Sequence, residues 1–385
     1  MSLIYQASIG DGRFLTEAIH FKKSKNFTVG IEIEFQLLDP QNLGLYPKAV
    51  EILSDLPKDF RARIKPEFIQ SMLEVNTAVC SNIKEAEHDL EHSIKMLEAV
   101  ASEKNCSIFA SSLHPFSSYQ DQKLYPDPRY EKILKELQVI GERLITQGLH
   151  CHIGLDSGET AIKVFDNIRA FLPMLLALSA SSPFWKGKDT GFASFRSKLF
   201  DALPRSGIPD TLESWDNYCQ LVNLLKNCGI ISQPRDIWWD VRPSPDLGTI
   251  EVRICDIPAR FNQIMALCAL IQALVAAIAT DSISLFPMHI AVLLNNKWQA
   301  ARHGLEGVFV DQQRFEKKMM KTMLIRTINA IEHIFDELGS RHYLPVLEKM
   351  IYYGPTSELF RKQLQKLGSL KKVIASFQEK FWDNN

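Results

Sequence analysis

Three short segments, far apart in the sequence, alternate between apolar side chains and charged or imidazole side chains. Residues 249–256 carry isoleucine or valine at every second position, with Glu251 and Arg253 between them. A period of two is typical of a β-strand, because successive side chains point to opposite faces of the sheet. The pattern therefore predicts a strand with one packed face and one face that presents a carboxylate and a guanidinium together.

The same arrangement recurs in two other segments. Glu32 and Glu34 share one face of a predicted strand that begins at Val29, and the opposite face is apolar. His150 and His152 share one face of a third predicted strand. Charged or ligating groups seldom gather on one face of a strand inside a large globular chain without a function. We infer that these polar faces line one cavity that holds metal ions.

The residue types indicate which metal. Two carboxylates on one buried face repel each other, and the pKa of each rises unless a cation lies between them. Half-exposed acids in water are the alternative for Glu32 and Glu34 taken alone, but Glu74, His150 and Glu251 from other predicted strands favour a buried site. Carboxylates with one or two histidines are typical of Mg²⁺ or Mn²⁺ sites, whereas zinc sites use more sulfur and imidazole.

A second pattern suggests zinc but fits poorly. Residues 88–92 match the H-x-x-E-H motif of one class of metalloproteases. Leu90 belongs to the apolar stripe of a predicted helix over 83–104, and His88 and His92 each lie two residues, or roughly 200°, away from it. We expect both histidines to face solvent and reject a zinc site here.

The sequence contains neither the P-loop motif nor the G-x-G-x-x-G motif, which disfavours P-loop and Rossmann nucleotide binding. A bound nucleotide would then depend on metal ions and arginines for its phosphates. Arg253 is the first candidate because it alternates in step with Glu251, followed by Arg242 and Arg196. A single arginine is more often a surface or ion-pair residue, and the spacing beside Glu251 is what distinguishes Arg253.

Charge and cysteine content narrow the class of protein. With 44 basic and 45 acidic residues among 385, the net charge of -1 gives no general attraction to nucleic acid or an anionic membrane. Residues 1–6 lack the pattern of a secretion signal. The seven cysteines form no C-x-x-C pair, which favours reduced thiols and a cytoplasmic location. Cys151 and Cys255 are expected to be inert core thiols, so no nucleophile stands out.

The order of predicted elements favours an α+β fold of about six strands, with helices on one side of the sheet and a polar face on the other. Residues 264–279 are apolar but short for a membrane span, so a buried core helix is expected. A long segment at 181–215, rich in glycine, hydroxyls and cations, suggests a functional loop. Strands are predicted at 29–37, 65–77, 107–113, 149–153, 237–242 and 249–256, and helices at 83–104, 130–144, 159–178, 260–285, 311–338, 341–352 and 356–381. A single domain over residues 1–385 is expected, with a β-rich part at 27–257 and a helical layer at 258–385.

Six motifs in order resemble the ATP-dependent carboxylate–amine ligases of the glutamate–cysteine ligase type 2 group, over nearly the whole chain. They are Gly30 to Phe35, Glu67 with Glu74 to Thr77, Gly148 to Gly154, Asp189 to Arg196, Ile237 to Pro243 and Thr249 to Arg253. The resemblance implies a fold like the catalytic domain of glutamine synthetase, in which a curved antiparallel sheet forms a funnel around two or three Mg²⁺ ions.

The resemblance also implies roles for individual residues. By motif position, the acids and histidine that bind Mg²⁺ or Mn²⁺ would be Glu32, Glu34, Glu67, Glu74, His150 and Glu251. The catalytic arginine that contacts phosphate would be Arg253. The family commonly has a third acid between the first two glutamates, where this chain has Ile33. Alternation places Ile33 on the packed face, so little functional loss is expected.

The expected activity is ATP-dependent joining of a carboxylate to an amine through an acyl phosphate, with glutamate and cysteine as the best substrate prediction. Substrate contacts are expected around Arg129, Tyr130 and Arg196. A small-molecule phosphotransferase and a non-catalytic metal- or nucleotide-binding regulator are the alternatives. The helices after residue 258 make a homodimer plausible.

Overall fold

A seven-stranded sheet lies at the centre of the computed structural model, which describes residues 17–284 and 288–383. All its strand pairs are antiparallel. The strand order is β10 (Val241–Ser244), β11 (Thr249–Val252), β5 (Leu149–Gly154), β1 (Val29–Leu38), β3 (Met72–Asn76) and β2 (Ile64–Pro66), and β4 (Ser107–Phe109) also pairs with β1. Helices and an antiparallel sheet confirm the predicted α+β class, with one more strand in the main sheet than the six expected.

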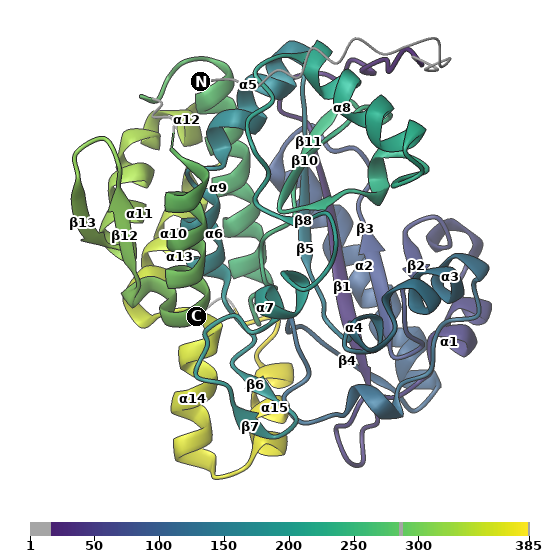
Figure 1. Cartoon of the computed structure of the whole chain (residues 1–385). Coiled ribbons are helices and arrows are strands. Elements are labelled where there is room, and N and C mark those ends of the chain that lie inside the picture. Colours follow the sequence, from purple (N-terminus) through teal and green to yellow (C-terminus); the bar gives the residue numbers. More distant parts are fainter. Residues whose placement is uncertain (1–16, 285–287, 384–385) are drawn as a thin grey trace.

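The odd-numbered side chains of β1 form part of the core. Val29, Ile31, Ile33 and Phe35 are at most 1% exposed. Helices α2 (Ile83–Glu103), α5 (Gly158–Ile168) and α9 (Phe261–Ala279) all contact strands of this sheet. Figure 1 shows α9 running alongside the sheet within the helical part of the molecule. The expected position of Ile33 on the packed face is therefore confirmed.

Helix α9 has the composition of a membrane span but lies in the core. Among the described residues it is the one helix long and apolar enough to cross a membrane, and 89% of the relevant window is buried inside the protein. The predicted helix over 260–285 is thus confirmed as a core helix but ends earlier, at Ala279, and residue 285 lies outside the described residues. The N-terminal residues 1–6, for which no secretion signal is expected, also lie outside them.

Several elements of the β-rich half differ from prediction. The strand predicted at 249–256 ends at Val252, and the helix predicted at 130–144 is divided in two at Gln138. The predicted strand 65–77 is a hairpin of β2 and β3, because the chain turns where Met72 N donates to Ile69 O. The predicted strand 107–113 ends at Phe109. The strand predicted at 237–242 is split into β9 (Trp238–Trp239) and β10, and β10 continues through Pro243. Pro243 is tolerated because β10 is an edge strand of the sheet.

The helical half also differs from prediction. Residues 308–319 form a hairpin of β12 (Val308–Asp311) and β13 (Glu316–Met319), so residues 311–319 are not the helix that was predicted. The Asp311 carboxylate accepts backbone N–H bonds from residues 313 and 314 and turns the chain. Gly368, with a φ of +67°, separates two helices that were predicted as one. The helices here are α10 (Ile290–His303), α11 (Met320–Ala330), α12 (Glu332–Glu337), α13 (Leu344–Tyr353), α14 (Thr356–Leu367) and α15 (Leu370–Glu379).

The segment predicted as a long loop at 181–215 contains short elements. They are β6 (Phe184–Trp185), β7 (Lys188–Asp189), α7 (Arg196–Phe200) and β8 (Ser206–Gly207). The predicted helix 159–178 is two helices, α5 and α6 (Leu172–Ser179), because Pro173 begins the second one. The other described α-helices are α1 (Ala49–Asp55), α3 (Pro128–Leu137), α4 (Val139–Glu142) and α8 (Trp215–Asn227).

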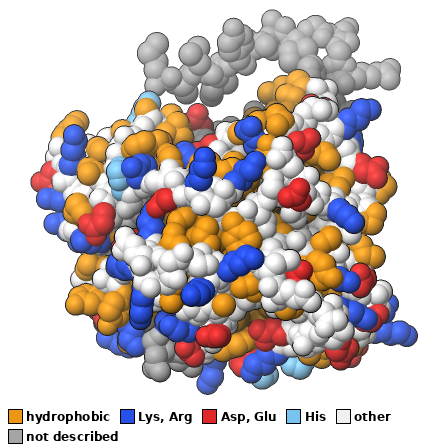
Figure 2. Space-filling model, turned by 90° about the horizontal axis from the view of Figure 1, so that it is seen from below, with side chains coloured by type: hydrophobic (Ala, Val, Ile, Leu, Met, Phe, Trp, Pro, Cys, Tyr) orange, Lys and Arg blue, Asp and Glu red, His pale blue; other side chains and the backbone are white. Residues whose placement is uncertain are grey.

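The surface carries both signs of charge. Figure 2 shows basic and acidic side chains interspersed with hydrophobic ones on the face seen from below. His88 and His92 are exposed on α2, as the position of the apolar stripe predicts. The two histidines therefore stay apart from the polar face of the sheet.

Candidate functional site

Strand register brings the predicted polar residues together on one face. Glu251 lies opposite His152, and Glu32 lies opposite His150 in the neighbouring pair. Glu34 lies opposite Glu74 in the next pair. Directly opposed residues on antiparallel strands have Cβ atoms about 4.5–5.5 Å apart. Segments more than 200 residues apart in sequence thus form one continuous polar surface across the sheet.

This surface forms the floor of an open cavity of about 380 Å³. The predicted site residues that line the cavity are Glu32, Glu34, Glu67, Glu74, Arg129, Tyr130, His150, Arg242 and Arg253. Glu251 lies beneath the floor and is 1% exposed. Of the predicted site residues, only Glu251 and Arg196 do not line this cavity.

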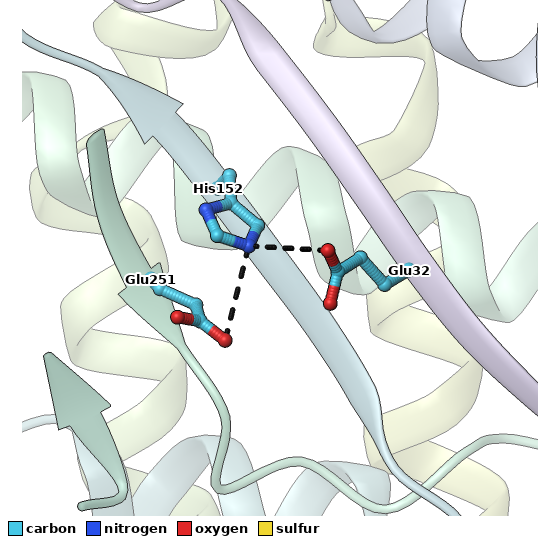
Figure 3. Close-up of side chains that lie close together, drawn as sticks. All are labelled: Glu32, His152 and Glu251. Carbon is cyan, nitrogen blue, oxygen red and sulfur yellow. Dashed lines mark ion pairs between the residues drawn. The ribbon is translucent and has the colours of Figure 1, made fainter. Parts of the chain in front are cut away.

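The first potential metal cluster consists of Glu32, His152 and Glu251. Figure 3 shows the two carboxylates reaching toward one imidazole from strands on either side of it. His152 Nε2 lies 3.6 Å from Glu32 Oε1 and 3.8 Å from Glu251 Oε1, and it is buried without a hydrogen-bond partner. On the other side of the ring, Nδ1 lies 2.9 Å from the hydroxyl of Thr249, which fixes the orientation of the imidazole.

Two arginines hold Glu251. Arg242 donates from Nε and Nη2 to the two carboxylate oxygens, at 2.5 and 3.2 Å, and Arg253 donates to Oε1. Burial alone would raise the pKa of Glu251, but the charges of Arg253 and Arg242 outweigh it and hold the pKa well below its usual range. Glu251 is therefore an anion that orients both guanidinium groups at the cavity.

The second cluster consists of Glu32, Glu74 and His150. His150 Nδ1 lies 3.3 Å from Glu32 Oε2. Burial, and then the charge of Arg253, lowers the pKa of His150 to about 4, so its ring is neutral and can act as a ligand. Burial opposes ionisation of Glu32, but the neighbouring imidazoles of His150 and His152 outweigh it and lower the pKa of Glu32 well below its usual value.

The third cluster consists only of carboxylates, Glu34, Glu67 and Glu74, whose oxygens lie within 4.8 Å of one another. Burial and the charge of Glu74 raise the pKa of Glu34 to about 7. Burial and the charges of Glu74 and Glu34 raise the pKa of Glu67 well above its usual value. Gly148 donates its backbone N–H to Glu34 Oε2 at 2.7 Å and fixes that side chain.

The donor set fits hard divalent cations. In each of three overlapping groups, the oxygen and imidazole donor atoms lie within 4.8 Å of one another, and none of the donors is a thiolate. His152 Nε2 is buried without a hydrogen-bond partner. Acids whose pKa is raised by neighbouring acids are stabilised when a cation separates them. Carboxylate oxygens with one or two imidazoles suit Mg²⁺ or Mn²⁺.

We expect stabilisation by Mn²⁺ or Mg²⁺ to increase with pH. The pKa of Glu34 is raised in the folded protein, so the metal-free fold binds more protons than the unfolded chain and loses stability as pH rises from about 4.5 to about 7. A cation competes with those protons, and a hundredfold excess over its Kd should add about 2.7 kcal/mol at high pH. Melting curves with and without metal at pH 5.5 and 8 test this. This expectation would be contradicted by an equal metal-induced rise in melting temperature at both pH values, or by an unchanged rise in the Glu34→Gln variant.

Arg196 lies outside the cavity, behind Arg253. It is 4% exposed, and its guanidinium donates to the carbonyls of Ile254 and Arg253 at 3.2 and 3.3 Å. Asp256 lies 3.7 Å from its Nη1. Because Arg196 is occupied by the backbone next to Arg253, the geometry favours support of that arginine over direct contact with a phosphate.

Asp256 is a buried residue that the sequence patterns did not single out. Its carboxylate accepts hydrogen bonds from Ser181 N, Ser182 Oγ and Ser194 Oγ at 2.7–2.9 Å. Burial raises its pKa, and the charge of Arg196 opposes the rise. Asp256 therefore fastens both ends of the 181–196 segment to the chain that follows β11.

Sequence reasoning also left His152 out of the predicted ligands. The signal was present, since alternation places His150 and His152 on one face, but only the strand order shows that His152 lies opposite Glu251. The thiols of Cys151 and Cys255 are buried on the packed side, and burial raises the pKa of Cys255. The burial of both thiols agrees with the prediction that they are inert core residues.

The fold has relatives among solved structures. A crystal structure of glutamate–cysteine ligase from Francisella tularensis in complex with AMP has a TM-score of 0.69 and 13% identity, covering 95% of this chain and 91% of that one. A bifunctional glutathione synthetase from Pasteurella multocida has a TM-score of 0.70 and 12% identity, covering 92% of this chain and 52% of that one. The sheet and its helices are thus those of a glutamate–cysteine ligase fold.

Sequence comparison identifies the family. Residues 28–375 match the Glutamate-cysteine ligase family 2 (GCS2). A protein of Herpetosiphon aurantiacus, provisionally named glutamate–cysteine ligase 2, is 37% identical over 90% of this chain and 91% of its own length. A protein of Gloeobacter violaceus with the same name is 34% identical over 94% of this chain and 98% of its own length. The chain belongs to the glutamate–cysteine ligase family 2, which confirms the resemblance found in the sequence.

Proposed function

We propose that this protein is an ATP-dependent ligase that joins the side-chain carboxylate of glutamate to the amine of cysteine. The observation that carries the proposal is the row of donors across the sheet, with carboxylates on β1 and β3 and paired arginines on β10 and after β11. Family membership and the similarity to named glutamate–cysteine ligases support the same reaction. ATP use is further supported by the AMP in the related Francisella structure.

The reaction needs an activated acid, because a carboxylate oxygen is a poor leaving group. Transfer of the γ-phosphoryl group of ATP to the carboxylate forms an acyl phosphate and ADP. Attack by the neutral amine on its carbonyl carbon then forms the amide and releases phosphate. Arg253 and Arg242 face the cavity in fixed orientations and would stabilise the charge that develops on the transferred phosphoryl group. Covalent catalysis by the protein is not required.

The same side chains would hold the cations. Glu32, Glu34, Glu67, Glu74, His150 and Glu251 are the proposed ligands, and His152 completes the first cluster. Bound Mg²⁺ or Mn²⁺ would neutralise charge on the phosphates. Arg196 would act through the backbone of Arg253, and Arg129 and Tyr130 at the mouth of the cavity would contact the amino-acid substrates.

One assay separates this ligase from a phosphotransferase or a regulatory protein. We expect phosphate release from ATP with Mg²⁺ only when glutamate and cysteine are both present, together with γ-glutamylcysteine detected by mass spectrometry. Each substrate omitted in turn is the control. A stable phosphorylated product from one substrate would indicate a phosphotransferase. Tight nucleotide binding without turnover would indicate a regulator.

The remaining proposals concern the whole chain. The site draws residues from 32 to 253, and α9 packs behind it, so one catalytic domain is proposed for residues 1–385. Among the described residues every cysteine is unpaired, which is compatible with a cytoplasmic location. A homodimer remains a proposal that light scattering would test.

A further inference from the structure

Lys297 is a buried cation on α10 that the proposed reaction does not use. It is 3% exposed, and its Nζ lies 2.7 Å from both Asp201 Oδ1 and Asp240 Oδ2. Burial alone would lower the pKa of Lys297, but the charges of Asp240 and Asp201 outweigh it and raise the pKa. Lys297 is therefore an ammonium ion shared by two carboxylates. A buried ion pair is weak evidence for stability, so its effect on geometry is the more informative property.

The two carboxylates belong to the two segments that hold the backbone of Arg253. The carbonyl of Asp240 accepts the N–H of Arg253 at 2.8 Å. Asp201 directly follows α7, and that helix begins at Arg196, whose guanidinium donates to the carbonyl of Arg253 at 3.3 Å. The N–H and the carbonyl of Arg253 are thus each bonded to a segment that forms an ion pair with Lys297.

Helix α10 is itself firmly fixed in the helical layer. It packs on α6, and the neighbouring Asn296 is fully buried. The side chain of Asn296 exchanges two hydrogen bonds with the backbone of Val310 on β12, at 2.9 and 3.0 Å. Figure 1 shows α7 between the helical part that contains α10 and the strands of the main sheet. Lys297 therefore joins a rigid helix to two segments at the arginine-lined part of the cavity.

Asp240 depends on Lys297 more than Asp201 does. Asp201 has a second partner, Lys198, whose Nζ lies 2.5 Å from Oδ2. Among the described residues, Asp240 Oδ2 is buried and has no hydrogen-bond partner besides its ion pair with Lys297. Loss of the ammonium group would therefore leave a buried carboxylate uncompensated at Asp240, one of the two segments that hold Arg253.

We propose, on the basis of the ligase function above, that Lys297 is a positioning residue that holds Asp240 and α7 together and thereby sets the guanidinium of Arg253 against the transferred phosphoryl group. Lys297 does not line the cavity and acts only through these neighbours. A displacement of about 1 Å in a reacting geometry can cost on the order of 10²-fold in rate. A small shift of this backbone should therefore lower kcat and leave amino-acid binding unchanged.

The first test is Lys297→Met, which keeps the length of the side chain and removes its charge. With ATP, Mg²⁺, glutamate and cysteine, we expect kcat to fall about tenfold or more, and KM for both amino acids to stay within about twofold. The melting temperature should also fall. Lys321→Met is the matched control, because Lys321 Nζ is also 2.7 Å from a carboxylate, that of Glu306, but at the surface. It should keep wild-type kinetics.

A double variant separates positioning from stability. Lys297→Met combined with Asp240→Asn removes the whole ion pair, so no buried charge is left uncompensated. The melting temperature should return most of the way to that of the wild type. Because the link between Asp240 and α7 is still missing, kcat should stay as low as in Lys297→Met. If Lys297→Met alone does not fold, the double variant is compared directly with the wild type.

The outcomes also distinguish this proposal from the ligase function. Recovery of kcat together with the melting temperature in the double variant would show that only charge compensation is needed, and the positioning role would be wrong. A raised KM for glutamate or cysteine with unchanged kcat would also overturn it, as would a double variant that does not fold. A wild-type enzyme that forms no γ-glutamylcysteine would instead overturn the ligase function, before any variant is compared.

Discussion

Replacing Glu251 by glutamine is expected to lower kcat by about 10²–10³-fold, the range for removing one fixed electrostatic contact to a transition state. The carboxylate receives Arg242 and Arg253 on its two oxygens and lies beneath the cavity floor. A neutral amide accepts on one atom only, so the two guanidinium groups lose their shared anchor and the first metal cluster loses one ligand. Steady-state kinetics with ATP, glutamate and cysteine measure the loss.

The control for this variant is Glu348→Gln, which makes the same chemical change on the exposed side of α13 and should keep wild-type activity. Circular dichroism should show that Glu251→Gln retains the fold, with a lower melting temperature because a buried ion pair has lost one charge. A fully active Glu251→Gln variant would contradict both the metal assignment and the anchoring of Arg253.

Replacing Asp256 by alanine is expected to lower the free energy of unfolding by about 3–5 kcal/mol, the range for removing one partner of a buried ion pair. Its carboxylate is fully buried, and Ser181 N, Ser182 Oγ and Ser194 Oγ would all lose their acceptor. Arg196 would lose its countercharge at 3.7 Å. Urea unfolding followed by tryptophan fluorescence measures the change.

Two comparisons make the Asp256 result specific. Glu332→Ala removes one exposed partner of Arg341 and should cost less than about 1 kcal/mol, as surface ion pairs do. Asp256→Asn keeps one acceptor oxygen and should cost less than the alanine variant. A loss under 1 kcal/mol in Asp256→Ala would show that the 181–196 segment is held by other contacts.

The predicted site followed from alternation because strand geometry is local. A period of two puts Glu32 with Glu34, and Glu251 with Arg253, on one face whatever the rest of the chain does. Glu32, Glu34, Glu74 and His150, which alternation singled out, therefore line the cavity, whereas Glu67 was predicted only from the family resemblance. The helix predicted over 311–319 was wrong, because the Asp311 carboxylate caps a tight turn that hydrophobic periodicity does not reveal.

The role of Arg196 could not be derived in this way. Its sequence neighbours resemble a functional loop, but its partners are the backbone carbonyls of Arg253 and Ile254, more than 50 residues away. Main-chain acceptors have no signature in a sequence, because every residue carries one. The same holds for Asp256, whose partners are three serine groups brought together by the fold.

The sequence by itself determined which side chains share a face and that those faces carry acids, imidazoles and guanidinium groups, since backbone geometry sets side-chain direction within each strand. Only the tertiary structure decided the order of the strands, and with it that His152 lies between Glu32 and Glu251 and that α3 faces the cavity with its apolar side. Strand order depends on the packing of the whole core against α2, α5 and α9, which no single segment encodes.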